Sequence, residues 1–217
     1  MPKQTFFNLP STKQALLIDL AIDEFSQYTY KSASIRRIIE KSGIAPGSFY
    51  QYFANKEDLY SYLFVLMAEK KRAFFAEKGV SSTPPTDIFA YLRGLAETSA
   101  QFELAHPRFS QLAYVALKNN SFPEEIVTEG TAKSATFLQD LIAQGKAAGT
   151  IDARYDDELV AFLFNLILTE LSQFMLQKRE AADEQRPFLD PTAPNNLFAQ
   201  TMTILEFGLR GREEYHE

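Results

Sequence analysis

One stretch, residues 34–56, constrains the fold of this 217-residue chain more than any other. Ile35, Ile38 and Ile39 recur at the i, i+3, i+4 spacing that places side chains on one buried face of a short helix. Gly43 follows, and glycine adopts the left-handed conformation that ends a helix at little cost. The pattern therefore predicts a short amphipathic helix that stops sharply at a turn.

A second short helix is predicted over residues 45–53, directly after that turn. Pro46 suits the first helical position, because its fixed φ and its missing N–H cost nothing there. Phe49 and Phe53 are four residues apart, so both can enter a small core and leave polar side chains on the outer surface. Two short helices held by a glycine turn form the helix-turn-helix arrangement that places side chains in the major groove of DNA.

A longer helix is predicted from Asn55 to about Lys78. Asn55 is a favourable N-cap, and Asp58 supplies the acidic first turn. Lys56 opposes the helix macrodipole, which indicates either a DNA phosphate bound beside it or a solvated surface lysine. An apolar stripe persists along this helix, so it is long enough to join a head to a body and to transmit movement between them.

The order and spacing of the residues over Thr12 to Leu63 resemble the DNA-binding domain of the TetR family of bacterial transcriptional regulators. The matching residues are Ala15, Leu16, Ala21, Phe25, Ser34-Ile35-Arg36, Ile38, Ser42-Gly43-Ile44, Gly47-Ser48-Phe49-Tyr50, Tyr52-Phe53 and Asn55-Lys56-Glu57-Asp58-Leu59. The chain departs from the family pattern in two places. Thr29 stands where the family usually has glycine, and Ala45 stands where it often has a capping serine or threonine.

The resemblance implies a three-helix DNA-binding head over residues 1–54 and a connecting helix with an effector-binding and dimerising body over residues 55–217. It also implies which residues meet DNA. The expected phosphate contacts are Ser34, Tyr50, Tyr52 and Lys56. The residues expected near bases or backbone are Arg36, Pro46, Gly47, Ser48 and Gln51.

The head and the body of the chain carry opposite net charges. The chain has a net charge of −6, which by itself argues against nucleic acid. Residues 1–78 hold 11 Lys and Arg against 8 Asp and Glu, whereas residues 79–217 hold 11 against 20. A mildly basic head and an acidic body indicate that only the head faces DNA. With no cysteine, no secretory signal and no apolar run of roughly 18 residues, a cytoplasmic protein is expected.

Periodicity predicts an all-α protein. Residues 1–10 lack a periodic pattern and are expected to form a mobile arm, and the first helix is expected from Ser11 or Thr12 to Tyr28. The stretch Gly79 to Pro85 is expected to end the connecting helix. Body helices are predicted at 86–105, 107–119, 123–148, 156–181 and 194–211.

The last two of these helices are unusually apolar. Residues 159–176 are apolar on more than one face, and residues 197–209 are also rich in apolar side chains. The resemblance implies that these two helices pair with their copies in a homodimer. Two heads set roughly 35 Å apart would then read the two half-sites of a palindromic operator.

A small-molecule pocket is harder to place. Aromatic side chains at helical spacing line apolar cavities, although most such residues are ordinary core. Asn165, Thr169 and Glu170 interrupt the most apolar helix, and Glu170 faces a pocket, solvent or the dimer seam. With these three, the candidate ligand residues are Phe64, Phe89, Phe102, Phe109, Tyr114, Phe137, Phe162 and Phe174.

Nothing in the sequence favours an enzyme, a cofactor or a metal. The two histidines, His106 and His216, have no partner at metal-binding spacing. The sequence therefore predicts a ligand-responsive repressor that binds double-stranded DNA as a homodimer and is released by a small, mostly apolar effector. Two alternatives stay open, a regulator controlled by a protein partner and a helical carrier or interaction protein that no longer binds DNA.

Overall fold

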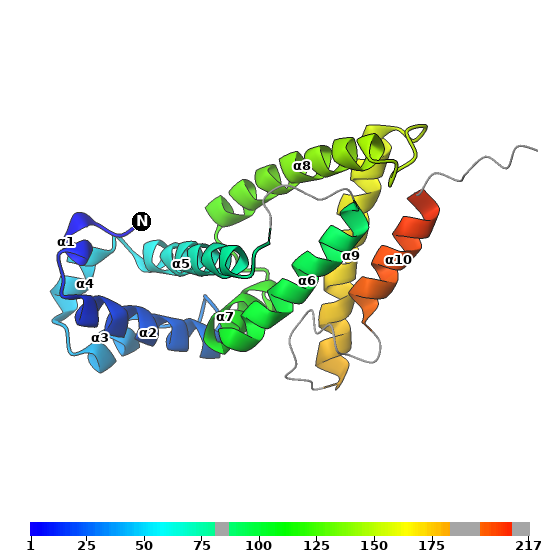
Figure 1. Cartoon of the computed structure of the whole chain (residues 1–217). Helices are drawn as coiled ribbons and strands as arrows, with labels where there is room; N and C mark the ends of the chain where they lie inside the picture. The colour runs from blue at the N-terminus through cyan, green and yellow to red at the C-terminus, as the bar shows by residue number, and fades with distance from the viewer. Residues whose placement is uncertain (81–86, 183–195, 210–217) are drawn as a thin grey trace, which may run out of the picture. The chain divides into compact units, whose positions relative to one another are not determined.

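The computed structural model describes residues 1–80, 87–182 and 196–209, and every regular element within these ranges is an α-helix (Figure 1). This confirms the predicted all-α class. The helices are α1 (Gln4–Phe7), α2 (Ser11–Gln27), α3 (Ile35–Ser42), α4 (Pro46–Tyr52), α5 (Lys56–Glu77), α6 (Ile88–Ala105), α7 (Pro107–Lys118), α8 (Glu124–Ala147), α9 (Asp157–Ala182) and α10 (Leu197–Leu209).

The boundaries of these helices agree with the sequence patterns to within a few residues. Gly43 takes φ of 69° at the end of α3, and Gly79 takes φ of 70° after α5, so both stops use the left-handed conformation. Thr29 needs no such conformation, because its hydroxyl and carbonyl bond Ser32 in a local turn. Residues 81–86, 183–195 and 210–217, the last of which include His216, lie outside the described residues.

The chain divides into two compact units. Unit 1 comprises Met1–Ala73 with Ala105–Glu129, and unit 2 comprises Phe74–Leu104 with Gly130–Glu217. Helices α5 and α8 each contribute residues to both units. The functional division after residue 54 stays a prediction, and the packing adds that the start of α5 and the buried face of α7 contribute apolar side chains to the core of unit 1.

The core of unit 1 joins the three helices of the head to α1, α5 and α7. Its fully buried side chains include Leu17, Ala21 and Phe25 of α2, Ile38 of α3, Phe49 of α4 with Phe53 directly after it, Leu59 and Leu63 of α5, and Leu112 and Ala116 of α7. Helix α2 also holds α7 through polar contacts, since the Arg108 guanidinium pairs with Asp19 at 2.9 Å and with Asp23 at 2.7 Å. The head is therefore packed against α7 as well as continuous with α5.

Unit 2 has a separate core in which α6, α8, α9 and α10 meet. Its buried side chains include Phe89 of α6, Leu141 of α8, Phe164 of α9 and Met202 of α10. Two contacts fix the end of α10, namely the Asp152 amide donating to the Leu209 carbonyl at 2.9 Å and an Arg93–Glu206 ion pair at 3.0 Å. Both α9 and α10 consequently bury one side within the unit.

The expectation of a mobile arm over residues 1–10 is wrong. Residues Gln4–Phe7 form α1, and the Phe6 side chain is 1% exposed in the core of unit 1. Its ring lies 5.1 Å from that of Phe53 and 5.8 Å from that of Tyr62. Aromatic burial of this kind overrides the absence of helical periodicity, because the stabilising contacts come from distant parts of the sequence.

The expectation that no stretch reaches the length of a spanning helix also needs correction. By length and composition alone, Asp157–Lys178 of α9 would suffice, since a helix tolerates isolated polar residues such as Glu170. Only 18% of that window is buried within the chain. Helix α9 therefore exposes much apolar surface that something else must cover.

Candidate nucleic-acid interface

The second helix of the predicted motif, α4, is held by its buried face and presents its other face outward. Phe49 and Phe53 are completely buried, and their rings stack 5.6 Å apart. Tyr50, one position on from Phe49, is 59% exposed, and Gln51 is exposed beside it. Burial of one stripe thus fixes which side chains a DNA groove can receive.

The turn before α4 has the predicted form. The Gly43 amide donates to the Ile39 carbonyl at 3.1 Å, and Ile44 packs against the core of unit 1. Ala45 occupies the N-cap of α4 without a side-chain hydrogen bond, as its methyl group requires. Pro46 takes the first helical position and has no N–H, so one fewer backbone donor is left without a partner at this end of α4.

A buried carboxylate that the sequence reading missed fixes α3 on α2. Glu24 is 2% exposed and accepts the Ser34 amide at 2.7 Å and the Arg37 Nε at 2.9 Å, with a second bond from Arg37 Nη2. The Arg37 guanidinium also lies 4.2 Å from the centre of the Tyr28 ring. Glu24 continues the buried stripe of Leu17 and Ala21 at i, i+4, i+7, which is the signal that could have identified it.

Burial acts to raise the pKa of Glu24, but the Arg37 guanidinium and the Ser34 amide outweigh burial, so its pKa lies below the ordinary value. The carboxylate is therefore charged at neutral pH. The carboxylate holds the first turn of α3 against α2. Ser34 caps the same turn, because its hydroxyl oxygen accepts the Arg37 amide at 3.4 Å. The entry to the helix-turn-helix is fixed by both contacts.

The nine predicted DNA contacts fall into two groups by exposure. The exposed residues are Arg36, Pro46, Gly47, Tyr50 and Gln51. The half-buried residues are Ser34, Ser48, Tyr52 and Lys56. The guanidinium of Arg36 pairs with Glu40 at 2.7 Å one turn along α3, and both side chains are open to solvent. This weak pair leaves Arg36 able to exchange Glu40 for a phosphate or a base.

Lys56 is placed differently from an open phosphate ligand. Its ammonium donates to the carbonyls of Tyr30 at 2.7 Å, Ala33 at 3.1 Å and Lys31 at 3.4 Å. It also lies 4.7 Å from the centre of the Tyr30 ring. An ammonium has three N–H donors, so a phosphate would have to displace a carbonyl of the loop between α2 and α3.

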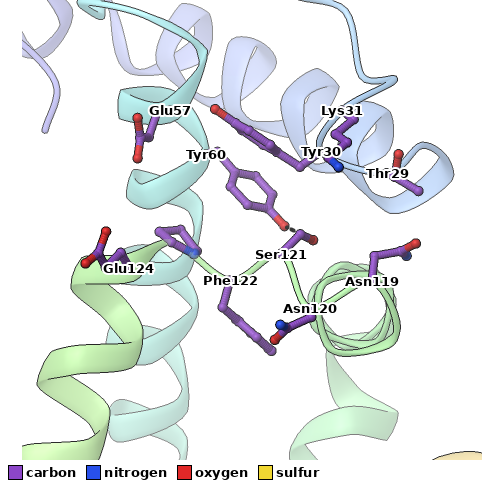
Figure 2. Close-up of a pocket in the computed structure, with 11 residues that line it drawn as sticks. Thr29, Tyr30, Lys31, Glu57, Tyr60, Asn119, Asn120, Ser121, Phe122 and Glu124 are labelled. Carbon is purple, nitrogen blue, oxygen red and sulfur yellow. Dashed lines mark hydrogen bonds between the residues drawn. The ribbon is translucent and has the colours of Figure 1, made fainter.

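A cavity of about 380 Å³ lies within unit 1, beside that loop (Figure 2). The residues that line it are Thr29, Tyr30, Lys31, Glu57, Tyr60, Asn119, Asn120, Ser121, Phe122, Pro123 and Glu124. Tyr60 points across it toward Ser121, and their hydroxyl oxygens are 3.5 Å apart. Burial raises the pKa of Tyr60, and burial with the nearby Glu57 raises that of Tyr30, so both phenols are neutral.

None of the predicted ligand residues lines this cavity, and they occupy different environments. Phe64 and Phe109 belong to the core of unit 1, and Phe89 and Phe137 belong to the core of unit 2. Phe102 is buried against Phe74 with ring centres 5.7 Å apart, and Tyr114 is half-buried. The remaining candidates are exposed on α9, namely Phe162, Asn165, Thr169, Glu170 and Phe174. The structure thus does not bring all eleven together.

These observations define a class of protein, a helix-turn-helix DNA-binding regulator with a helical body. Two family patterns match the chain, "Bacterial regulatory proteins, tetR family" over residues 17–63 and "Tetracyclin repressor-like, C-terminal domain" over residues 86–210. The chain belongs to the TetR family of bacterial transcriptional regulators, whose members are transcription factors and not enzymes.

Similar proteins agree with this assignment. A TetR family transcriptional regulator from Chloroflexus aurantiacus J-10-FL is 40% identical, with a TM-score of 0.69 over 98% of this chain and 100% of that one. FadR from Bacillus subtilis, solved in complex with stearoyl-CoA, is 16% identical with a TM-score of 0.61 over 88% and 97% of the two chains. The uncharacterized HTH-type transcriptional regulator YhgD of Bacillus subtilis is 21% identical over 70% of this chain and 78% of that protein.

Proposed function

We propose that this regulator is a repressor that binds a palindromic operator as a homodimer, in the cytoplasm, and is released by a small, mostly apolar effector. The observation that carries the proposal is the exposed face of α4. Tyr50 and Gln51 project from a helix whose opposite face is anchored by two fully buried phenylalanines. A phenol and an amide in that position suit contacts to phosphate and to base edges.

The proposed dimer interface is the exposed apolar face of α9 and α10. Leu159, Phe162 and Leu166 recur along one side of α9, and all three are exposed although the opposite side of the helix is core. On α10, Ile204 is 73% exposed and Phe207 is 81% exposed. A contiguous apolar surface of this kind is typical of a protein interface, and a two-fold copy would present the same faces to one another.

The effector is proposed to act from the body, with the eleven candidate residues as its predicted surroundings. Helix α5 runs from the core of the head into unit 2, so a ligand that favours one position of α5 would alter the head. A regulator of similar fold was solved with stearoyl-CoA, which supports an apolar ligand for a body of this type. Control by a protein partner is the second candidate, and it requires the same movement of the head.

The test is protection of the intergenic DNA beside the gene for this protein, at two salt concentrations. The wild-type dimer is expected to give a symmetric footprint that weakens steeply as salt rises, because released counterions oppose binding. Gln51→Ala should weaken the footprint clearly, and Gln139→Ala, at an exposed position of α8, should leave it at wild-type strength. An equally strong footprint from both variants would remove α4 as the reading helix.

A further inference from the structure

The end of the DNA-reading helix α4 depends on residues from the N-terminal segment. An α-helix leaves its last four carbonyls without partners inside the helix. In α4 these are the carbonyls of residues 49–52, and the Phe53 amide bonds the first of them at 2.9 Å. The other three belong to Tyr50, Gln51 and Tyr52, whose side chains are three of the nine predicted DNA contacts.

All three of these carbonyls accept hydrogen bonds from the N-terminal segment. The Lys3 ammonium donates to the Tyr50 carbonyl at 2.9 Å, and the Lys3 amide donates to the Tyr52 carbonyl at 2.8 Å. The Thr5 hydroxyl donates to the Gln51 carbonyl. The positive charge of Lys3 also stands at the negative end of the α4 dipole, where a cation is favourable.

Apolar packing fixes the segment in place. The Phe6 ring lies 6.4 Å from the Tyr52 ring in an edge contact and 5.1 Å from the Phe53 ring. Helix α1 has four residues and α4 has seven, so neither is long enough to be stable alone. Each short helix therefore depends on the other, and the position of α4 is set from its C-terminal end as well as from the turn at Gly43.

We infer that Lys3, Thr5 and Phe6 form a positioning element that sets the orientation of Tyr50, Gln51 and Tyr52 for DNA binding. The inference rests on α4 being the DNA-reading helix. The pattern of the TetR DNA-binding domain matches from residue 17 onward, so this element lies outside the region that the family pattern describes. The segment acts through α4 and not by touching DNA.

The decisive variant is Lys3→Met combined with Thr5→Val, which removes two donors and leaves Phe6 in the core. Two solvent-exposed bonds per head are expected to weaken binding to an operator duplex by about fivefold per head, or roughly 25-fold for a dimer with both heads engaged. Lys3→Arg combined with Thr5→Ser keeps the donors and is expected to restore binding to within about twofold. Gln4→Ala, at an exposed position of α1, is the matched control and should leave the affinity unchanged.

A double-mutant cycle separates positioning from a general loss of structure. In a Gln51→Ala background only the two tyrosines are left to orient, so Thr5→Val should reduce affinity by a smaller factor than it does in the wild-type background. The salt dependence should keep the wild-type slope for Lys3→Met, whereas loss of a direct phosphate contact would lower the slope by about 0.9 per head. Equal effects of Thr5→Val in both backgrounds, or a reduced slope for Lys3→Met, would overturn the inference.

Hydrogen exchange of the full-length protein without DNA provides a second test, which does not depend on the operator. The peptide covering residues 46–53 should exchange faster in the Lys3→Met, Thr5→Val variant than in wild type, while peptides from α9 stay unchanged. Unchanged exchange over residues 46–53 would overturn the positioning role even where DNA binding is weakened. If wild-type protein binds no operator but the exchange rises as expected, the proposed function fails and the structural role of α1 stands.

Discussion

Replacing Glu24 by glutamine is expected to destabilise the head, because Glu24 is a buried carboxylate whose partners come from α3. The carboxylate is 2% exposed and receives three charge-assisted or backbone bonds from Ser34 and Arg37. Glutamine retains one oxygen for the Ser34 amide. Its NH2 group, however, would face the Arg37 guanidinium, which has no acceptor to offer it.

The magnitude follows from the exposure of the two partners. A hydrogen bond to a charged group contributes about 1.5–3 kcal/mol, and losing one side of a fully buried pair costs about 3–5 kcal/mol. The Arg37 side chain is 39% exposed, so water can hydrate it once its partner is gone. We therefore expect Glu24→Gln to lower the free energy of unfolding by about 2 kcal/mol, which for a chain of this length lowers Tm by about 4–8 °C.

The assay is thermal unfolding followed by circular dichroism, at one protein concentration and at several pH values. The pKa of Glu24 is lowered from its ordinary value of 4.5 in the folded protein. Its contribution is therefore complete above pH 4.5 and is lost as the pH falls through the lower, folded-state pKa. The difference in Tm between wild type and Glu24→Gln should be largest at neutral pH and should decrease in acid.

The control is Glu40→Gln, which removes the carboxylate of an exposed pair with Arg36 and should change stability by less than about 0.5 kcal/mol. Equal Tm values for the two variants would refute the claim that Glu24 holds α3 on α2. A gap that widens as the pH falls would contradict the assigned direction of the Glu24 pKa shift.

Three further outcomes are expected. Phe207→Glu should convert the dimer to monomer or aggregate in light scattering, while Val127→Glu, an exposed apolar position of α8, should leave the dimer intact; a dimer that survives Phe207→Glu would count against the α10 face. Lys56→Met should lower the free energy of unfolding by about 1–3 kcal/mol and keep the salt dependence of DNA binding, whereas a slope reduced by about 0.9 per head would show a phosphate contact. Gly43→Ala, at positive φ, should lower stability by about 1 kcal/mol, and Gly130→Ala, inside α8, should raise it by up to about 1 kcal/mol; the same sign for both would refute the left-handed assignment.

The helices were predictable because their signals are local. Gly43, Pro46 and Asn55 mark a stop and two starts by their own conformational preferences, and the structure uses each of them as such: Gly43 with φ of 69°, Pro46 at the first turn, and Asn55 Oδ1 accepting the Asp58 amide at 2.8 Å. The apolar spacing of Phe49 and Phe53 likewise determined which face of α4 is buried. The helical class and the exposed face of α4 therefore follow from sequence alone.

The contacts that hold the head together were less accessible, because they join residues distant in sequence. Phe6 finds its partners at positions 52, 53 and 62, and Lys56 finds its carbonyls at positions 30, 31 and 33. A four-residue helix carries no periodicity, and a lysine at a helix start gives the same local signal whether it binds DNA or a loop. Glu24 is the exception, since its place on the stripe of Leu17 and Ala21 was visible.

The predicted ligand residues show a different limit. An aromatic side chain at helical spacing looks the same in sequence whether it fills a core or lines a cavity. Phe64 and Phe89 are fully buried in two separate cores, while Phe162 is exposed on α9. Which of these the proposed effector would meet depends on packing between elements and, for α9, on the proposed second copy of the chain.

The central claim is that α4 reads a palindromic operator for a dimer, and selection of bound sequences from random duplex DNA tests it most directly. The wild-type protein is expected to enrich two inverted half-sites whose centres lie one helical turn, roughly 35 Å, or a multiple of that apart. Tyr50→Ala should enrich the same sequence weakly or not at all. A folded wild-type dimer that enriches no sequence, or enriches one half-site without its inverted copy, would contradict the account.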